Sequence, residues 1–203
     1  MNIFKNKKEE INYSSNYKGI LNFFLELIKI VIISLAIIIP IRAYVAQPFY
    51  VEGASMEPNF YDKEYLIIDE ISYRFTEPER GDVVIFHPPN NPKQYYIKRI
   101  IGLPNETVEI KDNNIIIYNK EHPDGFILDE SQYLEGQSFN ISKDTKFSPL
   151  GDNQYFVLGD NRSNSMDSRR LGPINRSSIK GQVLVRAFPF NRFTIFTNSN
   201  FYE

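Results

Sequence analysis

The sequence contains no cysteine and no tryptophan, and it has only two histidines, His87 and His122. The absence of cysteine excludes structural disulfides, thiolate catalysis and cysteine-based zinc sites. Any chemistry that depends on histidine would have to use one of these two residues. The formal net charge is only -2, and no basic patch falls on a candidate recognition element. We therefore expect no nucleic-acid partner.

Aromatic residues, in contrast, are plentiful. They make up 14% of the 203 residues, with 16 Phe and 13 Tyr. This is enough apolar material to build a core, so the chain is not disordered overall. The length predicts one folded domain with an appendage, or two small lobes.

The longest hydrophobic run lies near the N-terminus. Residues 30–41 are almost entirely aliphatic, and the run extends back to residue 23. A helix over 23–44 would be about 33 Å long, enough to cross the hydrocarbon core of a bilayer. Glu26 and Lys29 lie near its N-terminal end, where they can pair or reach the interface. We predict a tail at 1–22 followed by a transmembrane helix at 23–44.

Two other interpretations of this run are a buried core helix and a cleaved secretory signal. Cleavage after Ala46 would place the bulky Tyr44 where a small residue is needed, and Pro48 follows closely. An uncleaved anchor fits better. The tail carries more lysine than the short stretch after the helix, where Arg42 stands alone. The positive-inside rule then places the tail in the cytoplasm and the remainder on the exterior face.

Beyond residue 45 the pattern is mainly β. Turn residues separate seven short runs of β-branched and aromatic residues, and long helical periodicity is missing. The predicted strands are Tyr65–Asp69, Asp82–Phe86, Tyr95–Ile101, Thr107–Ile110, Asn114–Tyr118, Gln154–Leu158 and Gln182–Arg186. We predict a β domain formed by 45–110 and 151–203, with the more polar stretch 111–150 as an inserted β-rich extension.

Three segments of this domain carry residues capable of chemistry. Ser55 stands in a tight turn after Gly53, which permits a close backbone approach. Lys98 lies in a strongly apolar strand, where burial would lower the pKa of its amine and let it accept a hydroxyl proton. The loop 159–169 is rich in small polar residues that can cap backbone groups. Taken separately, these are also compatible with an exposed turn serine, a lysine on the solvent face and a polar surface loop.

The same loop does not match a cation-binding EF-hand loop. Arg162 and Arg169 interrupt it, and the acidic residue that would end an EF-hand loop is missing. We expect no metal and no other cofactor.

Together, in this order and after one hydrophobic segment, these segments resemble the bacterial type I signal peptidase family. The resemblance rests on Ser-Met-Glu-Pro at 55–58, Tyr-Ile-Lys-Arg-Ile-Ile-Gly-Leu-Pro at 96–104 and Gly-Asp-Asn-Arg-x-Asn-Ser-x-Asp-Ser-Arg at 159–169. Arg-Gly-Asp-Val-Val at 80–84 adds a fourth match, and the similarity reaches to about Phe188. It implies a signal-peptidase/SOS-repressor-like β catalytic core.

The resemblance implies a role for several residues. Ser55 would be the nucleophile, Lys98 the general base, and Ser165 the residue that orients the lysine. The backbone N–H of Ser55 would be the first donor of the oxyanion hole. Ion pairs would hold the loop in place, and the residues expected to form them are Asp160, Asp167, Arg99, Arg162 and Arg169.

The implied substrates are secreted preproteins, cleaved after a small-x-small site, usually Ala-x-Ala. Apolar side chains expected to form the shallow substrate pockets are Phe49, Val51, Ile85, Tyr96 and Ile97. Preproteins and the lipid bilayer are the expected partners, and a monomer is expected although the sequence does not fix the oligomeric state. The implied location is the bacterial plasma membrane, with one membrane pass.

Two positions depart from the family pattern. Many relatives have Ser or Thr where this chain has Gly53, and that hydroxyl helps to form the oxyanion hole, so the second donor is left open. Asn59 stands where Thr is common, and we expect this difference to matter little.

Four alternative functions fit the sequence less well. A histidine-based hydrolase would need His87 or His122, and neither has a convincing Asp and Ser partnership. A soluble Ser–Lys autoprotease of the SOS-repressor type usually carries a DNA-binding motif and no anchor. A catalytically inactive binding module would not require the complete set of nucleophile, base and orienting serine. The eukaryote-like branch of the family has His at the position of Lys98.

Overall fold

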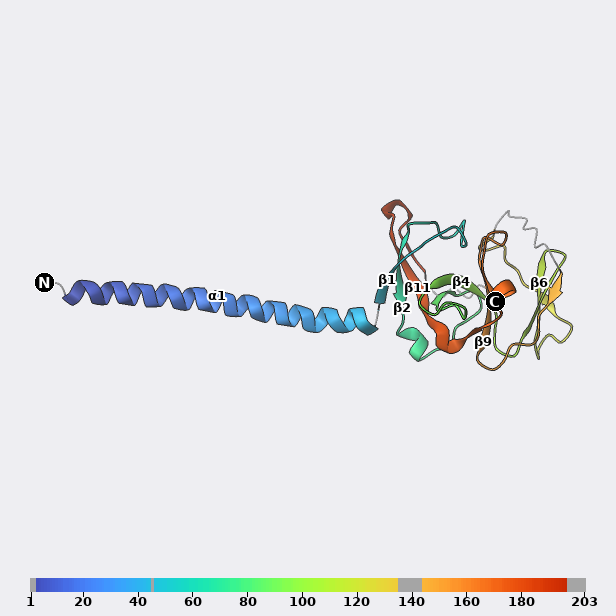
Figure 1. Ribbon diagram of the computed structural model, residues 1–203, viewed down its shortest axis with the longest axis horizontal. Coiled ribbons are helices and arrows are strands. Elements are labelled where there is room, and N and C mark those ends of the chain that lie inside the picture. Colours follow the sequence, from blue (N-terminus) through green and yellow to red (C-terminus); the bar gives the residue numbers. More distant parts are fainter. Residues whose placement is uncertain (1–2, 45, 135–143, 197–203) are drawn as a thin grey trace. The chain divides into compact units, whose positions relative to one another are not determined.

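The computed structural model describes residues 3–44, 46–134 and 144–196. The chain divides into two compact units, Met1–Val45 and Ala46–Glu203. The first unit contains the helix α1 (Ile3–Tyr44). The second contains all the strands (Figure 1).

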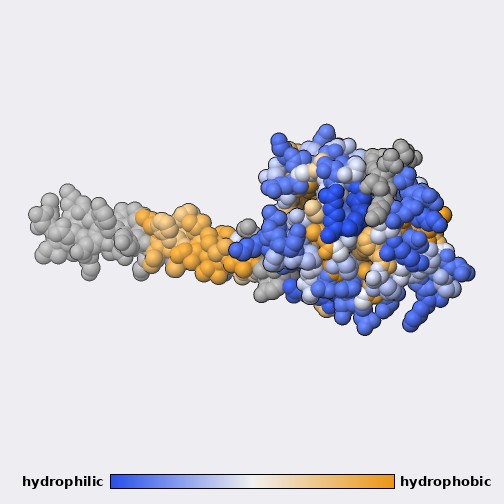
Figure 2. Space-filling model, turned by 45° about the vertical axis from the view of Figure 1, so that its right-hand side comes forward, coloured by the Kyte–Doolittle hydropathy of each residue, from blue (hydrophilic) through white to orange (hydrophobic). Residues whose placement is uncertain are grey.

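The apolar part of α1 is long enough to cross a membrane. Gly19–Ile39 has a mean hydropathy of 2.4, and none of it is buried inside the protein. Its side chains form a continuous hydrophobic band (Figure 2). The apolar stretch begins four residues before the span predicted from the sequence and ends five residues earlier.

The main sheet of the second unit is antiparallel throughout. Its strands lie in the order β1-β2-β11-β3-β4-β9-β10. One further strand, β12, lies outside this order and pairs with β11. The bounds are β1 Ala46–Tyr50, β2 Tyr65–Asp69, β3 Val83–Phe86, β4 Tyr96–Gly102, β9 Gln154–Leu158, β10 Ile174–Asn175, β11 Ile179–Phe188 and β12 Thr194–Ile195. Five of the seven predicted strands belong to this sheet.

A second, smaller sheet has the order β7-β6-β5-β8. Its strands are β5 Thr107–Lys111, β6 Asn114–Tyr118, β7 Phe126–Ile127 and β8 Thr145–Lys146. The hairpin between β5 and β6 turns at Asp112 and Asn113, whose φ angles of 48° and 62° suit a type I′ turn. The sheet therefore starts at Thr107, four residues before the extension predicted at 111–150. Figure 1 shows β6 apart from β2, β11 and β4.

The mainly β fold expected from the sequence is confirmed. Short helical elements connect the strands: α2 Ser168–Leu171, and three 3₁₀ turns at Ser72–Arg74, Arg176–Ser178 and Phe190–Arg192. One apolar cluster packs beneath the turn that contains Ser55 and consists of Val51, Met56, Phe60, Leu66, Ile68, Ile85, Ile97 and Val183. This cluster supports the turn rigidly, because close-packed protein interiors have low compressibility.

Candidate active site

Ser55 lies in an irregular turn between β1 and β2. Backbone bonds tie the two ends of this connection together, from Val51 N to Glu64 O and from Lys63 N to Val51 O, both at 2.9 Å. Gly53 has a φ of 86°, a left-handed conformation that glycine adopts without strain. The half-buried Ser55 is thus presented by a short, tied loop.

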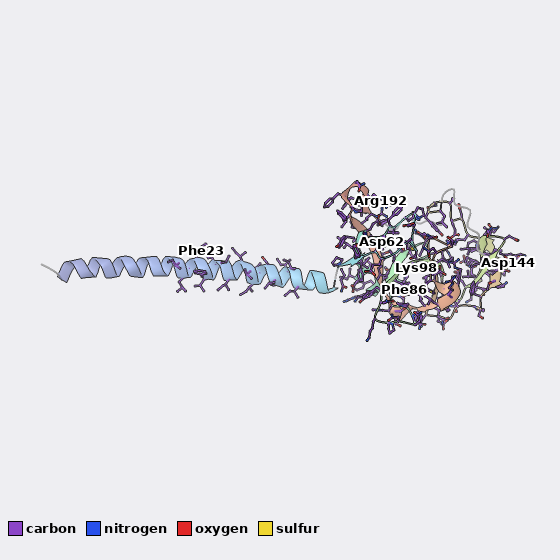
Figure 3. The ribbon with its side chains drawn as sticks, turned by 45° about the horizontal axis from the view of Figure 1, so that its top comes forward. Phe23, Asp62, Phe86, Lys98, Asp144 and Arg192 are labelled. Carbon is purple, nitrogen blue, oxygen red and sulfur yellow. The ribbon has the colours of Figure 1, made fainter. Side chains whose placement is uncertain are left out.

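Lys98 comes from the centre of β4, where it pairs with Val84 of β3. Its Nζ donates hydrogen bonds to Ser55 Oγ at 2.8 Å and to the carbonyl oxygen of Ile97 at 2.6 Å. The residue is 3% exposed and lies in the interior of the β domain (Figure 3). Burial lowers the pKa of Lys98 to about 8, although the nearby carboxylates of Asp167 and Asp160 oppose this shift.

A cavity of about 470 Å³ opens beside these two residues. All five side chains predicted for the substrate pockets line it, together with Ser55 and Lys98. The remaining lining residues are Tyr50, Glu52, Leu66, Gln94, Tyr95 and Met166. The serine and the lysine therefore face a recess with a largely apolar wall, which is the setting that keeps an amine neutral.

The loop after β9 packs directly against the backbone of Ser55. The Asn161 N–H donates to Ser55 O at 3.1 Å, and Asn161 Nδ2 donates to Ala54 O at 3.0 Å. A methyl group on Gly159 would lie 2.5 Å from Ser55 O and 2.2 Å from Ser165 Oγ. The contact is so close that glycine is needed at this position.

Asp167 holds the far end of this loop. Its fully buried carboxylate accepts a bond from the Gly159 N–H at 3.0 Å and forms an ion pair with Arg169 at 2.7 Å. It also caps α2 by accepting from the Arg169 N–H. Burial opposes ionisation of Asp167, but the bonds from Arg169 and Gly159 outweigh it, and the pKa of Asp167 is lowered.

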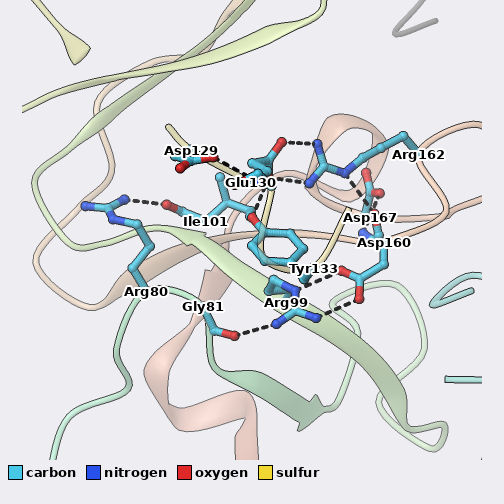
Figure 4. A network of polar contacts seen from close by, with 12 residues as sticks. Arg80, Gly81, Arg99, Ile101, Asp129, Glu130, Tyr133, Asp160, Arg162 and Asp167 are labelled. Carbon is cyan, nitrogen blue, oxygen red and sulfur yellow. Dashed lines mark hydrogen bonds and ion pairs between the residues drawn. The ribbon is translucent and has the colours of Figure 1, made fainter. Parts of the chain in front are cut away.

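Asp160 holds the near end of the loop to the strand that carries the lysine. Its two oxygens accept from Arg99 Nε at 2.9 Å and Nη2 at 2.7 Å, and Arg99 Nη1 donates to Gly81 O at 2.9 Å (Figure 4). Asp160 also accepts from Asn59 Nδ2 at 2.8 Å. Asn59 therefore joins the turn after the nucleophile to this pair, a contact that the sequence did not reveal.

Residues Asp129–Leu134 belong to the predicted extension and contact the same group of polar residues. We call them the clamp segment. Glu130 pairs with Arg162, one bond being 2.8 Å long, and accepts from Tyr133 OH at 2.5 Å. The Arg99 guanidinium lies 4.0 Å from the centre of the Tyr133 ring (Figure 4). Asn59 donates to Tyr133 O at 2.7 Å. Neither Glu130 nor Tyr133 was predicted as a site residue.

Of the predicted ion pairs, the structure forms Arg99–Asp160 and Arg169–Asp167, whereas Arg162 pairs with Glu130. The buried hydroxyl of Ser165 meets the geometric criteria for no hydrogen bond among the described residues, yet it lies close enough to Asp167 to help lower the pKa of that carboxyl. The bonds that Lys98 Nζ makes go to Ser55 and Ile97, so the orienting contact from Ser165 stays a prediction.

The two histidines make other contacts. His87 Nδ1 lies 3.1 Å from Gln94 O, and its ring stacks on Tyr95 at 4.3 Å between centroids. His122 packs against Phe126 in the second sheet. Neither ring is bonded to Ser55 in the described part of the chain.

A serine bonded to a buried lysine, at the edge of an apolar recess in a β core, is the arrangement of a serine peptidase. The family described as "Signal peptidase, peptidase S26" matches residues 24–188. The chain belongs to this family of serine peptidases.

Known relatives agree. The chain is 36% identical over 182 residues to "Probable signal peptidase I-2" of Synechocystis, and the aligned region covers 87% of this chain and 79% of the relative. It is 35% identical to signal peptidase I T of Bacillus subtilis, covering 91% and 96%. It is 34% identical to signal peptidase I of Bacillus licheniformis, covering 84% and 91%. A crystal structure of a signal peptidase I from Enterococcus faecalis is 32% identical, with a TM-score of 0.43 and coverage of 53% of this chain and 97% of the other.

Proposed function

We propose that this chain is a membrane-bound serine endopeptidase that removes N-terminal signal peptides from secreted preproteins by cleavage after a small-x-small site. Ser55 is the nucleophile and Lys98 the general base. The observation that carries the proposal is the 2.8 Å bond between Lys98 Nζ and Ser55 Oγ. A pKa of about 8 leaves part of the lysine neutral at physiological pH.

In the first half of the reaction, neutral Lys98 takes the hydroxyl proton as Ser55 Oγ attacks the scissile carbonyl carbon. The resulting ammonium then gives that proton to the departing amine, and an acyl-enzyme on Ser55 remains. In the second half, Lys98 takes a proton from water, the water oxygen attacks the ester, and the proton returns to Ser55 Oγ. Lys98 thus accepts and then donates a proton in each half of the reaction.

The oxyanion that forms during each attack needs donors already in place. The N–H of Ser55 has no acceptor among the described residues, which leaves it available for this role. Gly53 brings no side-chain donor, and its own N–H is already bonded to Asp62 at 2.8 Å. The N–H of Ser55 is therefore the donor that this turn offers, and Gly53 adds no second one.

The walls of the recess support a preference for small side chains. Val51, Ile85 and Ile97 line it, yet each is at most 9% exposed because each also belongs to the packed core beneath. Enlarging the recess would require these core residues to move, which costs packing energy. Phe49 and Tyr96 complete the apolar wall. Such fixed walls favour alanine over a bulky residue.

The helix α1 supports a membrane anchor. Its exposed apolar stretch Gly19–Ile39 has the length and composition of a span, and lysines precede it. We infer a single-pass protein of the bacterial plasma membrane with a cytoplasmic N-terminus and an exterior catalytic domain. An anchor raises the effective concentration of the enzyme towards substrates held at the same membrane.

The test uses the full chain in liposomes and a preprotein with an Ala-x-Ala site. Ser55→Ala and Lys98→Ala should each lower the cleavage rate by about 10³-fold or more. The control Lys93→Ala, which removes an exposed lysine, should cleave as the wild type does. A preprotein in which the final Ala of the site is replaced by Trp should stay uncleaved. Near-normal cleavage by Lys98→Ala would overturn the assignment of the base.

A further inference from the structure

Asn161 forms two hydrogen bonds with the backbone around the nucleophile, and neither bond has a role in the reaction described above. Its N–H bonds to Ser55 O, and its side-chain amide bonds to Ala54 O. Asn161 therefore binds the carbonyl groups of Ala54 and Ser55, which are consecutive in the chain. Asn161 does not reach the serine hydroxyl through either bond.

These bonds, together with a bond of 3.3 Å from the Glu57 N–H to the same Ala54 O, fix where the Ser55 N–H points. Cis peptides in the described chain occur only before Pro58 and Pro189, so the Ala54–Ser55 peptide is trans. In a planar trans peptide the N–H points opposite to the C=O. Because Ala54 O faces Asn161, the Ser55 N–H faces away from it. The same reasoning applies to the Met56 N–H, since Ser55 O also faces Asn161.

The Asn161 side chain is itself held in this orientation. Its Oδ1 accepts from Ser163 Oγ at 3.0 Å and from the Asn164 N–H at 3.2 Å. Both are donors, so the acceptor end of the amide is directed at them and the donor end is left for Ala54 O. Directly before Asn161 in the chain, Gly159 packs against Ser55 O and Asp160 is fixed by Arg99. The loop is therefore a firm support for the turn.

We propose that Asn161 is the positioning residue of the oxyanion hole, a role that rests on the proposed peptidase function. Ser55 N–H and Met56 N–H have no acceptor among the described residues, and Gly53 supplies no hydroxyl. In this arrangement the peptide N–H groups of Ser55 and Met56 meet the developing negative charge, and Asn161 holds the carbonyls on the opposite side of the same peptides. Small misalignments of such donors weaken stabilisation of the transition state without much effect on ground-state binding.

The test compares Asn161→Ala and Asn161→Asp with the wild type in liposomes. The Asp variant keeps the shape and the acceptor atoms but loses the donor to Ala54 O. Asn153→Asp is the matched control, because it places the same charge on an exposed asparagine outside this loop. All rates are measured on the alkaline plateau, where Lys98 is neutral in every variant. Both Asn161 variants should lower kcat by about 10- to 100-fold with KM within about twofold, and the control should not.

A second measurement separates positioning from a general role in folding. A peptide aldehyde ending in a small-x-small sequence forms a tetrahedral adduct with a serine, in which its oxygen occupies the oxyanion hole. Its affinity should fall by the same factor as kcat/KM, while the affinity of the corresponding carboxylate product peptide and the melting temperature stay unchanged. Unchanged kcat, or an equal loss of affinity for aldehyde and product, would overturn the proposal. A wild type that neither cleaves preproteins nor binds the aldehyde would instead reject the peptidase function, and this inference with it.

Discussion

Lys98 Nζ donates a 2.8 Å hydrogen bond to Ser55 Oγ, although the two residues are 43 positions apart in the chain. β4 supplies the lysine, and the tied connection between β1 and β2 supplies the serine. Burial favours the neutral amine, and the two buried carboxylates of the loop, Asp160 and Asp167, favour the charged one. The balance between these effects gives the site its pH dependence.

The rate should rise with pH up to about 8 and then level off. The pKa of Lys98 is lowered from 10.5 to about 8, so below pH 8 the neutral fraction grows about tenfold per pH unit. A plot of kcat/KM against pH for a signal-peptide substrate checks this, because its acidic limb reports the free enzyme. A limb near the ordinary pKa of lysine would show that burial does not control the base.

Asp167→Asn should move this acidic limb to lower pH. Asp167 is the largest of the charges that raise the pKa of Lys98, so removing its charge makes the ammonium less stable and the neutral amine more abundant. The rate at pH 7, relative to the plateau, should therefore increase. Asp152→Asn, at an exposed position, serves as the control and should leave the limb in place. Movement of the limb to higher pH would contradict the conclusion that the charge of Asp167 raises the pKa of Lys98.

Gly159→Ala should lower kcat by about 100-fold. The added methyl would lie 2.5 Å from Ser55 O, so the loop or the nucleophile turn must shift. A displacement of about 1 Å at reacting groups costs on the order of 10²-fold in rate. Gly151→Ala is the control, since its methyl would meet only the flexible end of Gln154. Rates of single turnover measure the effect directly, and a Gly159→Ala enzyme with wild-type kcat would refute the tight packing.

The strands were predictable from sequence because β-branched and aromatic runs bounded by turn residues determine them locally, as in Gln154–Leu158, whose predicted and observed bounds coincide. The pairing of Ser55 with Lys98 was not a local property. It was expected only from the resemblance of three separate motifs. The loop 159–169 was expected to be held by ion pairs, but the partner of Arg162 came from a distant, polar segment.

Asn59 and Asn161 show what sequence reasoning missed. Asn59 was expected to matter little, yet it joins Asp160 to the clamp segment, and the bonds of Asn161 are to backbone atoms about 107 positions away. A backbone carbonyl is available at every residue, so no pattern of side chains marks one as a partner. Such contacts exist only after the sheets have assembled. Structure is needed to find positioning residues of this kind.

The clamp segment should contribute to stability through a buried charge. The Arg162 side chain is 1% exposed, and Glu130, 16% exposed, forms an ion pair with it through two bonds. Removing one partner of a buried pair leaves the other charge uncompensated and costs about 3–5 kcal/mol. Glu130→Gln keeps the size of the side chain and one acceptor, so we expect a loss near 3 kcal/mol. For a domain of this size, that corresponds to a fall in melting temperature of about 6–12 °C.

Glu77→Gln provides the matched comparison, because it removes the same kind of charge from an ion pair with Arg176 in which Glu77 is 76% exposed. An exposed ion pair contributes about 1 kcal/mol or less to the free energy of unfolding, so the melting temperature of the Glu77→Gln variant should differ from that of the wild type by only a few degrees. Thermal unfolding of the two variants in the same detergent distinguishes the cases. Equal shifts would mean that solvent reaches Arg162 as readily as Arg176, and that the clamp segment does not hold the catalytic loop through this charge.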